Sequence, residues 1–450
     1  MSALTSQRAT IFALSSASGR AGVAVIRVSG PHAGMALTVM AGKRPKPREA
    51  VGRKIVHPTS GELLDRGVVI WFPAPKSFTG EDVVELHLHG SVAVVRAVLA
   101  ALGELPECRM AEPGEFARRA FDNGKIDLTQ AEGLADLIDA ETEGQRRQAL
   151  RQAQGALSSL YESWRQSLIE AAGLVEASID FSDEADIASD AFAQGRAIVQ
   201  DLERGIGRHL ADEHRGEILR SGFQVVLAGP PNVGKSSLLN SLARREAAIV
   251  SEEAGTTRDV IEVRLDLAGL PVVVSDTAGI RATEVAVERE GIRRSLARVS
   301  DADLVIWLTD IHVPEPSLPE ALRALADRTL LVVNKTDLAG DGVQPLLPDD
   351  MIAISVKTGA GLDVLTTRLA GIAQERISLG DAPALTQDRH RRLLEQALED
   401  LHAFLLGDPN QTELRAEDLR RAAVAIGRIT GRIDVEDILD QVFNRFCIGK

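Results

Sequence analysis

The stretch FQVVLAGPPNVGKSSLLN, residues 223–240, decides the fold of this 450-residue chain. It opens with a β-like apolar run and closes with a helical pattern. Between them, GPPNVGKS (residues 229–236) matches the pattern G-x-x-x-x-G-K-[ST]. In such a loop successive backbone N–H groups wrap phosphates, Lys235 neutralises their charge and the Ser236 hydroxyl ligates Mg²⁺. The stretch therefore predicts an α/β nucleotide-binding domain.

Three further motifs follow apolar runs in a fixed order. In DTAG (residues 276–279) the aspartate supports Mg²⁺ and the glycine N–H can sense a γ-phosphate. In NKTD (residues 334–337) a carboxylate can accept two hydrogen bonds from guanine N1 and N2, and SVK (residues 355–357) would contact the same base. NKTD alone would be an ordinary turn. Because all four motifs follow strands, whose C-terminal ends bind ligands in doubly wound sheets, the series predicts a guanine-nucleotide site.

A polar loop, SEEAGTTRD (residues 251–259), lies between the first two motifs and is expected to act as switch I. Its Thr257 hydroxyl would complete the Mg²⁺ shell with that of Ser236. The whole predicted GTP-binding set is Asn232, Val233, Gly234, Lys235, Ser236, Ser237, Ser251, Glu252, Glu253, Ala254, Gly255, Thr256, Thr257, Asp276, Thr277, Ala278, Gly279, Asn334, Lys335, Asp337, Ser355, Val356 and Lys357.

The residue that orients the attacking water is missing from its usual place. Ile280 follows Gly279, where many small GTPases carry a glutamine, and an aliphatic side chain cannot polarise water. The charged residues downstream are the candidates: Arg281, Glu284, Glu288 and Glu290. The residues alone leave the choice open, and a solvated helix charge is the alternative for each of them.

The remaining sequence surrounds this domain. Residues 1–118 alternate β-like and helical runs, which indicates a small α/β domain; residues 119–215 and 379–450 are helical in pattern, and 216–378 form the inserted α/β domain. Short helical pieces would each lack a core, so we expect one helical domain split by the insert. In the expected strand 83–89, alternation places Glu85, His87 and His89 on one face, for which a solvated surface is the simplest interpretation.

Composition restricts the possible partners. The chain has 51 Lys and Arg against 65 Asp and Glu, a net charge of −14, and few aromatic residues, so RNA binding would require local basic patches or a basic partner. Two cysteines exclude a disulfide scaffold and fit a reducing cytoplasm. Apolar runs are strand-sized, and the N-terminal pattern is not that of a signal peptide, so we expect a cytoplasmic protein with no membrane segment.

Four flanking signatures add a resemblance that extends over essentially the whole chain. They are GRAGVAVIRVSG (residues 19–30), SFTGEDVVELHLHG (77–90), GEFARRAFDNGKIDLTQAE (114–132) and the terminal FCIGK (446–450). With GTTRD and the nucleotide motifs, the chain resembles the bacterial and organellar tRNA-modification GTPases of the MnmE, or TrmE, family. FCIGK is the most specific of these signatures, since ribosome-assembly GTPases with a GTTRD switch lack it.

The resemblance implies a fold and a reaction. It implies an N-terminal folate-binding and dimerisation domain, a split helical domain and an inserted Ras-like GTPase domain. The family is a homodimer that forms a heterotetramer with an FAD-dependent partner. Together they add an aminomethyl or carboxymethylaminomethyl group at C5 of the wobble uridine of certain tRNAs, and the one-carbon donor is a tetrahydrofolate derivative in the 5,10-methylene or 5-formyl form.

The resemblance also assigns residues. Arg27, Glu85, Lys125 and Lys450 match the folate-binding set, and Glu288 matches the acid that positions the attacking water. The family hydrolyses GTP with K⁺ bound, and the matching ligands are Asn232, Ser251, Glu253 and Thr256, with Glu253 contributing a main-chain carbonyl. Such a cation can offset charge on the transition state.

The sequence departs from the family pattern at several positions. Ser91, Ala21 and Ala24 replace glycines near the folate signatures, and Val356 replaces the usual alanine of the base-contact motif. Cys447 is either a nucleophile or a buried structural thiol.

A ribosome-assembly GTPase that acts as a switch on rRNA is the competing function. The tail from residue 382, however, contains no recognisable basic RNA-binding module. A third class, a membrane-remodelling GTPase, would need a membrane anchor.

Overall fold

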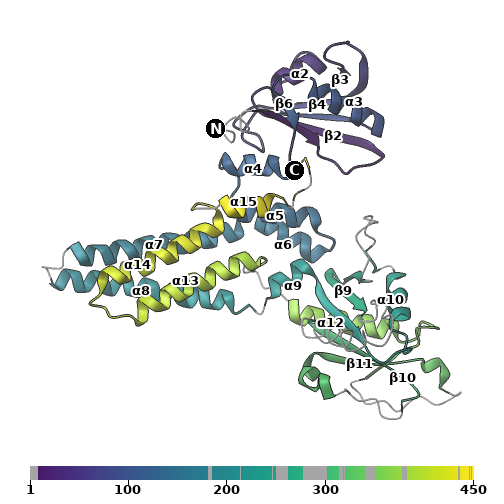
Figure 1. Ribbon diagram of the computed structural model, residues 1–450, viewed down its shortest axis with the longest axis vertical. Coiled ribbons are helices and arrows are strands. Elements are labelled where there is room, and N and C mark those ends of the chain that lie inside the picture. The colour runs from purple at the N-terminus through teal and green to yellow at the C-terminus, as the bar shows by residue number, and fades with distance from the viewer. Residues whose placement is uncertain are drawn as a thin grey trace, which may run out of the picture. The chain divides into compact units, whose positions relative to one another are not determined.

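A computed structural model describes residues 9–180, 185–212, 214–245, 247–249, 262–276, 302–313, 318, 320–339, 351–377, 383–433, 436–444, 446 and 448–449 (Figure 1). The chain divides into two compact units. The first comprises residues 1–135, 152–166 and 423–450, and the second comprises residues 136–151 and 167–422.

The first unit contains a six-stranded sheet in the order β3-β4-β5-β2-β1-β6. All neighbouring pairs are antiparallel except β1 and β6. The strands are β1 (Thr10–Leu14), β2 (Ala21–Ser29), β3 (Val51–Val56), β4 (Leu63–Phe72), β5 (Val83–Gly90) and β6 (Cys108–Met110). In β5, Val84, Leu86 and Leu88 are buried while Glu85, His87 and His89 are partly or fully exposed, which confirms the face predicted from alternation.

Helices cover one face of this sheet. Apolar residues of α2 (Ala33–Ala41) and α3 (Val92–Gly103) form a core with Ile26, Leu86 and Trp71 of the strands. A second core joins α4 (Glu115–Asp122) and α5 (Leu128–Asp139) to α15 (Glu436–Phe443) near the C-terminus. There Phe443 lies 6.1 Å from Phe121, ring centroid to centroid. Residues from both ends of the sequence therefore build the first unit.

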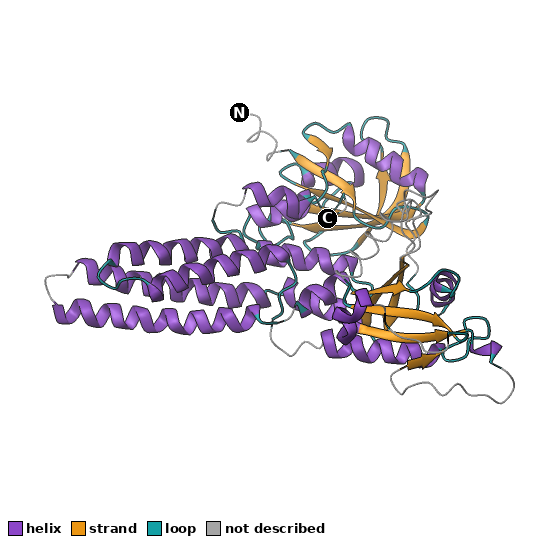
Figure 2. Ribbon diagram, turned by 60° about the horizontal axis from the view of Figure 1, so that its bottom comes forward, coloured by secondary structure: helices purple, strands orange, loops and turns teal. Residues whose placement is uncertain are grey.

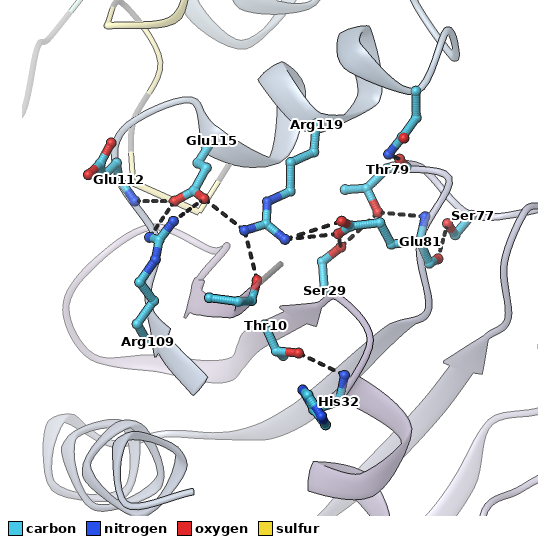
Figure 3. A network of polar contacts seen from close by, with 12 residues as sticks. Thr10, Ser29, His32, Ser77, Thr79, Glu81, Arg109, Glu112, Glu115 and Arg119 are labelled. Atoms are coloured by element: carbon cyan, nitrogen blue, oxygen red, sulfur yellow. Dashed lines mark hydrogen bonds and ion pairs between the residues drawn. The ribbon is translucent and has the colours of Figure 1, made fainter. Parts of the chain in front are cut away.

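A buried arginine ties α4 to the sheet (Figure 3). Arg119 is 6% exposed, and its guanidinium donates to both Glu81 carboxylate oxygens, at 3.2 and 3.1 Å, and to Glu115 at 2.9 Å. The Ser29 hydroxyl of β2 donates to Glu81 at 2.7 Å. Burial by itself would raise the pKa of Glu115, but hydrogen bonds from Arg109, the Glu112 backbone and Arg119 outweigh it and hold that pKa below its usual value.

The second unit contains the sheet predicted from the nucleotide motifs. Its order is β12-β11-β10-β7-β9-β8, and only β8 is antiparallel to its neighbour. The chain leaves β7 for β8 and β9 on one side and returns to β10 on the other, so the end of β7 is a topological switch point. The strands are β7 (Phe223–Ala228), β8 (Glu262–Leu267), β9 (Leu270–Asp276), β10 (Leu304–Asp310), β11 (Thr329–Asn334) and β12 (Met351–Ala353).

Helices flank this sheet and continue into the helical domain. Those beside the sheet are α9 (Arg215–Ser221), α10 (Lys235–Ala243), α12 (Leu362–Ile377) and the short η1 (Glu320–Arg328) and η2 (Thr336–Leu338). Apolar residues of α10 and α12 join the sheet's core, for example Leu239 and Leu369. The remaining helices are α6 (Glu143–Ala153), α7 (Ala156–Asp180), α8 (Ala185–Leu210), α13 (Asp388–Leu406) and α14 (Thr412–Thr430).

The long helices lie side by side in Figures 1 and 2. Phe192 of α8 stacks on Phe404 of α13 with ring centroids 5.8 Å apart, and Arg420 of α14 pairs with Glu176 of α7 at 2.7 Å. Segments on both sides of the α/β insert therefore share one helical assembly, as expected. In the described part of the chain, none of the helices combines the length and apolarity needed to cross a membrane.

Candidate functional site

The loop after β7 has the backbone of a phosphate cradle. Asn232 and Gly234 adopt left-handed conformations with φ of 62° and 102°, and Gly234 caps the N-terminus of α10. A Cβ on Gly234 would come within 2.5 Å of the Asn334 side-chain nitrogen, so this position requires glycine. The loop therefore leads into the N-terminus of α10, whose first backbone N–H groups have no partner within the helix and can bind phosphate.

Lys235 is held against this loop. Its Nζ donates to the carbonyl oxygens of Gly229 and Pro230, each at 2.8 Å. Burial lowers the pKa of the Lys235 ammonium, and the negative charge of Asp276 acts in the opposite direction. A partly desolvated ammonium that donates to neutral carbonyl groups can exchange them for anionic phosphate oxygens at little cost.

Ser236 and Asp276 meet at the end of β9. The Ser236 hydroxyl donates to Asp276 Oδ2 at 2.7 Å, and Asp276 is buried. An alcohol oxygen and a carboxylate on neighbouring elements are the hard oxygen donors that Mg²⁺ prefers. The Ser236 hydroxyl and the Asp276 carboxylate therefore fit the predicted Mg²⁺ ion.

A cavity of about 770 Å³ opens beside the loop and the base-contact motifs. The Asp337 carboxylate accepts a hydrogen bond from the Ser355 hydroxyl at 2.6 Å, and Lys357 lies 3.9 Å from its other oxygen. Ser355 and Lys357 of the SVK motif therefore lie against the Asp337 carboxylate of the NKTD motif. The described members of the predicted GTP-binding set that line the cavity are Asn232, Gly234, Ser237, Asn334, Lys335, Asp337, Val356 and Lys357.

Lys335 is oriented by a carboxylate of the neighbouring strand. It has φ of 65°, and its Nζ lies 2.5 Å from Asp310 Oδ2 at the end of β10. This hydrogen bond lowers the pKa of Asp310. The sequence reasoning missed Asp310; its position at the end of an apolar strand beside the base-contact strand was the signal that could have found it.

Several predicted residues lie outside the described part of the chain. They are Ser251, Glu252, Glu253, Ala254, Gly255, Thr256 and Thr257 of the polar loop, Thr277, Ala278 and Gly279 after β9, Glu288, Lys450 and Cys447. The structure therefore assigns geometry to the phosphate loop, to Asp276 and to the base-contact residues.

A second cluster lies in the first unit, around Arg27. Arg27 on β2 and Glu85 on β5 are direct cross-strand partners, and the guanidinium donates to Glu85 Oε1 at 3.2 and 3.0 Å. His87 lies 3.3 Å from the other Glu85 oxygen. The Arg27 guanidinium carbon also lies 5.7 and 5.8 Å from the ring centroids of Phe78 and Phe116. The sequence reasoning gave neither ring a role, although Phe78 lies in the signature of residues 77–90 and Phe116 in that of residues 114–132.

The C-terminal segment contacts the end of β1, the strand that pairs with β2. Gly449 O accepts a hydrogen bond from the Ser15 hydroxyl at 2.8 Å, directly after β1, and Ile448 bridges to Pro113. Ala13 of β1 is the cross-strand partner of Arg27, so Gly449 contacts a residue two positions after the strand neighbour of Arg27. Lys125, the remaining member of the predicted folate set, packs against Gly80, in the loop that carries Phe78.

Comparisons with known proteins identify the family. A family model described as the MnmE helical domain matches residues 128–447, and one described as the GTP-binding protein TrmE N-terminus matches residues 10–125. A tRNA modification GTPase MnmE from Parvibaculum lavamentivorans is 53% identical over 98% of this chain and 100% of its own. The chain belongs to the MnmE family. A second member, from Paramagnetospirillum magneticum, is 52% identical over 98% of this chain and 99% of its own.

Family membership sets the enzyme class and the fold class. MnmE proteins are tRNA modification GTPases, and the chain is accordingly a GTP-binding GTP hydrolase of tRNA modification. The predicted fold class, an N-terminal α/β domain and a helical domain split by a P-loop GTPase domain, is confirmed. Among solved structures, the G domain of the T. maritima FeoB iron transporter matches 33% of this chain and 98% of that chain, at 28% identity and a TM-score of 0.25.

Proposed function

We propose that this chain is a K⁺-dependent GTPase that, with an FAD-dependent partner, adds an aminomethyl or carboxymethylaminomethyl group at C5 of the wobble uridine of certain tRNAs. A tetrahydrofolate derivative, in the 5,10-methylene or 5-formyl form, is the one-carbon donor. The observation that supports the proposal is the placement of residues 448–449 against the end of β1, the strand that pairs with the Arg27 strand β2. It joins the most specific family signature to the predicted folate set in a chain that also holds a GTP site.

The folate set has the chemistry needed to hold a pterin. Glu85 offers carboxylate oxygens to the ring N–H groups, and Arg27 fixes that carboxylate while packing against two aromatic rings. Lys125 and Lys450 would supply positive charge at the margin of the site. When bound, the folate supplies the one-carbon unit.

In the GTP site, Lys235 and the N–H groups at the start of α10 bind the phosphates, and Asp337 reads guanine. Ser236, Asp276 and Thr257 would hold Mg²⁺, which offsets phosphate charge. Glu288 positions the attacking water, replacing the polar group that Ile280 does not provide. Asn232, Ser251, Glu253 and Thr256 would hold K⁺, which supplies further positive charge to the transition state.

The proposal includes an assembly and a location. The chain forms a homodimer through its first 118 residues and a heterotetramer with the FAD-dependent protein, and it acts in the cytoplasm. We place the domain boundaries near residues 118, 215 and 378. Exposed apolar residues on the sheet of the first unit, Val23 at 55% and Val68 at 39% exposure, support an interface there.

Mass analysis of wobble uridines tests this function. In cells that lack the protein, tRNA should lose the C5 modification, and the wild-type gene should restore it. A variant with Glu85→Gln should fail to restore it while its GTP turnover is unchanged, because Glu85 lies in the first unit and the GTP site in the second. If wobble uridines are normal in the null cells and ribosomal subunits accumulate unassembled instead, the ribosome-assembly alternative is correct.

A further inference from the structure

An ion pair at the end of β10 lies beside the base-contact motif. Asp310, the last residue of β10, is the register partner of Asn334 on the neighbouring strand β11 (Figure 1). Its Oδ2 lies 2.5 Å from the Lys335 Nζ, and the two side chains are only 16% and 36% exposed. The hydrogen bond from Lys335 lowers the pKa of Asp310. The pair is therefore a charged, partly buried contact.

The backbone of Lys335 is held in an uncommon conformation. Its φ of 65° lies in the left-handed region, which residues other than glycine rarely adopt. Such a conformation persists only where the surroundings fix it, and it is concentrated at ligand-binding and catalytic sites. Lys335 lines the cavity of about 770 Å³ together with Asp337, whereas Asp310 is not among the described residues that line it. The lysine side chain therefore reaches from the cavity wall to a carboxylate outside the cavity.

This arrangement determines what Lys335 offers to a ligand. Because its ammonium is bound by Asp310, the four-carbon stem remains available to the cavity. Lysine stems cover apolar surface while their charged ends are bound elsewhere. A base that binds at Asp337 would then contact hydrocarbon instead of a desolvated charge.

The same pair keeps the Lys335 charge away from Asp337, two residues further along the chain. One oxygen of Asp337 accepts from the Ser355 hydroxyl, and the other has the Lys357 ammonium 3.9 Å away. A second ammonium at this carboxylate would occupy the lone pairs that guanine N1 and N2 need. Asp310 removes that competition by binding Lys335 itself.

We propose that Asp310 is a positioning residue for guanine: it holds the Lys335 ammonium outside the cavity, so that the stem contacts the base and Asp337 stays available to read it. The inference rests on the proposed reading role of Asp337. Asp310 also has a structural contact, since its Oδ1 accepts from the His312 backbone N–H at 3.0 Å. The two roles use different oxygens, so one substitution can separate them.

The test uses Asp310→Asn in the full-length chain, because asparagine can keep the bond to His312 while its amide nitrogen cannot accept one from an ammonium. GTP and GDP, which share the base, should both bind about tenfold more weakly, with a raised KM for GTP and little change in kcat. The preference for GTP over inosine triphosphate should also fall, since inosine lacks the 2-amino group that Asp337 would accept. The matched control is Asp266→Asn, a β8 residue that accepts from the Gly269 N–H at 2.7 Å, which should bind as the wild type does.

A double-mutant cycle identifies the route of the effect. Lys335→Met removes the ammonium and keeps an apolar stem, so on that background Asp310→Asn should cause no further loss of GTP affinity. Wild-type affinity and nucleotide preference in Asp310→Asn overturn the inference.

Two further results also overturn it. An equal loss of affinity in both backgrounds, or a loss in Asp310→Ala that Asp310→Asn does not show, assigns Asp310 to the turn after β10. Equal binding of GTP and inosine triphosphate to the wild type rejects the reading role of Asp337 itself, together with the inference that rests on it.

Discussion

The side-chain amide of Asn334 joins the base-contact loop to the phosphate loop. Its Nδ2 donates to the Val233 carbonyl at 2.8 Å, across 101 positions of sequence, and its Oδ1 accepts from the Val356 backbone N–H at 3.1 Å. Asn334 is 2% exposed, so neither bond is replaced by bulk water. One side chain therefore sets the spacing between the phosphate loop of residues 229–236 and the two loops predicted to bind the base.

Replacing Asn334 with alanine should weaken GTP binding. The change leaves a buried carbonyl and a buried N–H without partners, a cost of about 1–3 kcal/mol, or roughly 5- to 150-fold in affinity if the loops shift to recover them. Fluorescent GTP titration measures it. Thr336→Ala, which removes a side-chain hydrogen bond to Ile354 in the same loop, is the control and should bind nearly as the wild type does.

Replacing Asp337 with asparagine should abolish the preference for guanine. The carboxylate would accept two N–H groups of the base, and the amide places a donor opposite one of them, so GTP affinity should fall by roughly 1.5–3 kcal/mol. Xanthosine triphosphate should bind better to the variant than to the wild type. The control is Asp363→Asn on α12, whose side chain is 90% exposed. An unchanged preference for GTP would reject Asp337 as the reading residue.

GTP turnover should depend on K⁺ and on protein concentration. We expect faster hydrolysis in KCl than in NaCl of the same ionic strength, and a rate per chain that rises as GTPase domains meet. Asn232 has φ of 62°, so glycine is the substitution that removes the amide without straining the backbone. Asn232→Gly should lose the difference between the two salts. Equal rates for the wild type in KCl and NaCl contradict the prediction.

Glu288→Ala should abolish hydrolysis while sparing GTP binding. Nucleotide affinity depends on the phosphate loop and the base-contact residues, whereas Glu288 would act on the attacking water only in the transition state. Single-turnover rates and equilibrium binding, measured on the same samples, separate the two effects. Glu284→Ala and Glu290→Ala serve as matched controls and should keep the wild-type rate. Parallel loss of affinity and rate in Glu288→Ala would show a structural role instead.

Stability should fall below neutral pH because of His209 on α8. Burial lowers the pKa of this imidazole to about 4. In the unfolded chain the imidazole titrates near pH 6.5. Between about pH 6.5 and 4 the unfolded state therefore binds a proton that the folded state does not. This difference lowers the free energy of unfolding by on the order of 3 kcal/mol at most. The melting temperature should therefore drop from pH 7.5 to pH 5, and His209→Gln should reduce that drop. An identical drop in melting temperature in the variant would exclude His209 as the cause.

Strong local patterns made the nucleotide-binding sheet predictable from sequence. The strand and helix around GPPNVGKS appear as β7 and α10, because a phosphate loop requires both in sequence order. The face of β5 was predictable for the same kind of reason, since strict alternation leaves Glu85, His87 and His89 on its solvent side.

Other elements carry no such pattern. In β1 the residues Ile11, Phe12 and Ala13 are buried on both faces of the sheet, so alternation is absent and the strand was not predicted. Phe78 and Phe116 come from a loop and a helix that meet only in the folded unit around Arg27. No spacing rule connects Ser15 with Gly449, because tertiary packing alone brings them together.

That contact has a consequence for synthesis. Ser15 and Gly449 are 434 positions apart, so β1 leaves the ribosome long before the segment that completes its surroundings. At about 5–20 residues per second, the interval is roughly 20–90 s. During this time the first unit lacks α15 and the strand-end contacts of residues 448–449. Translation that stops after α12, which ends at Ile377, but before Ile448 therefore yields a chain whose GTPase domain can be whole while the predicted folate surface around Arg27 remains unfinished.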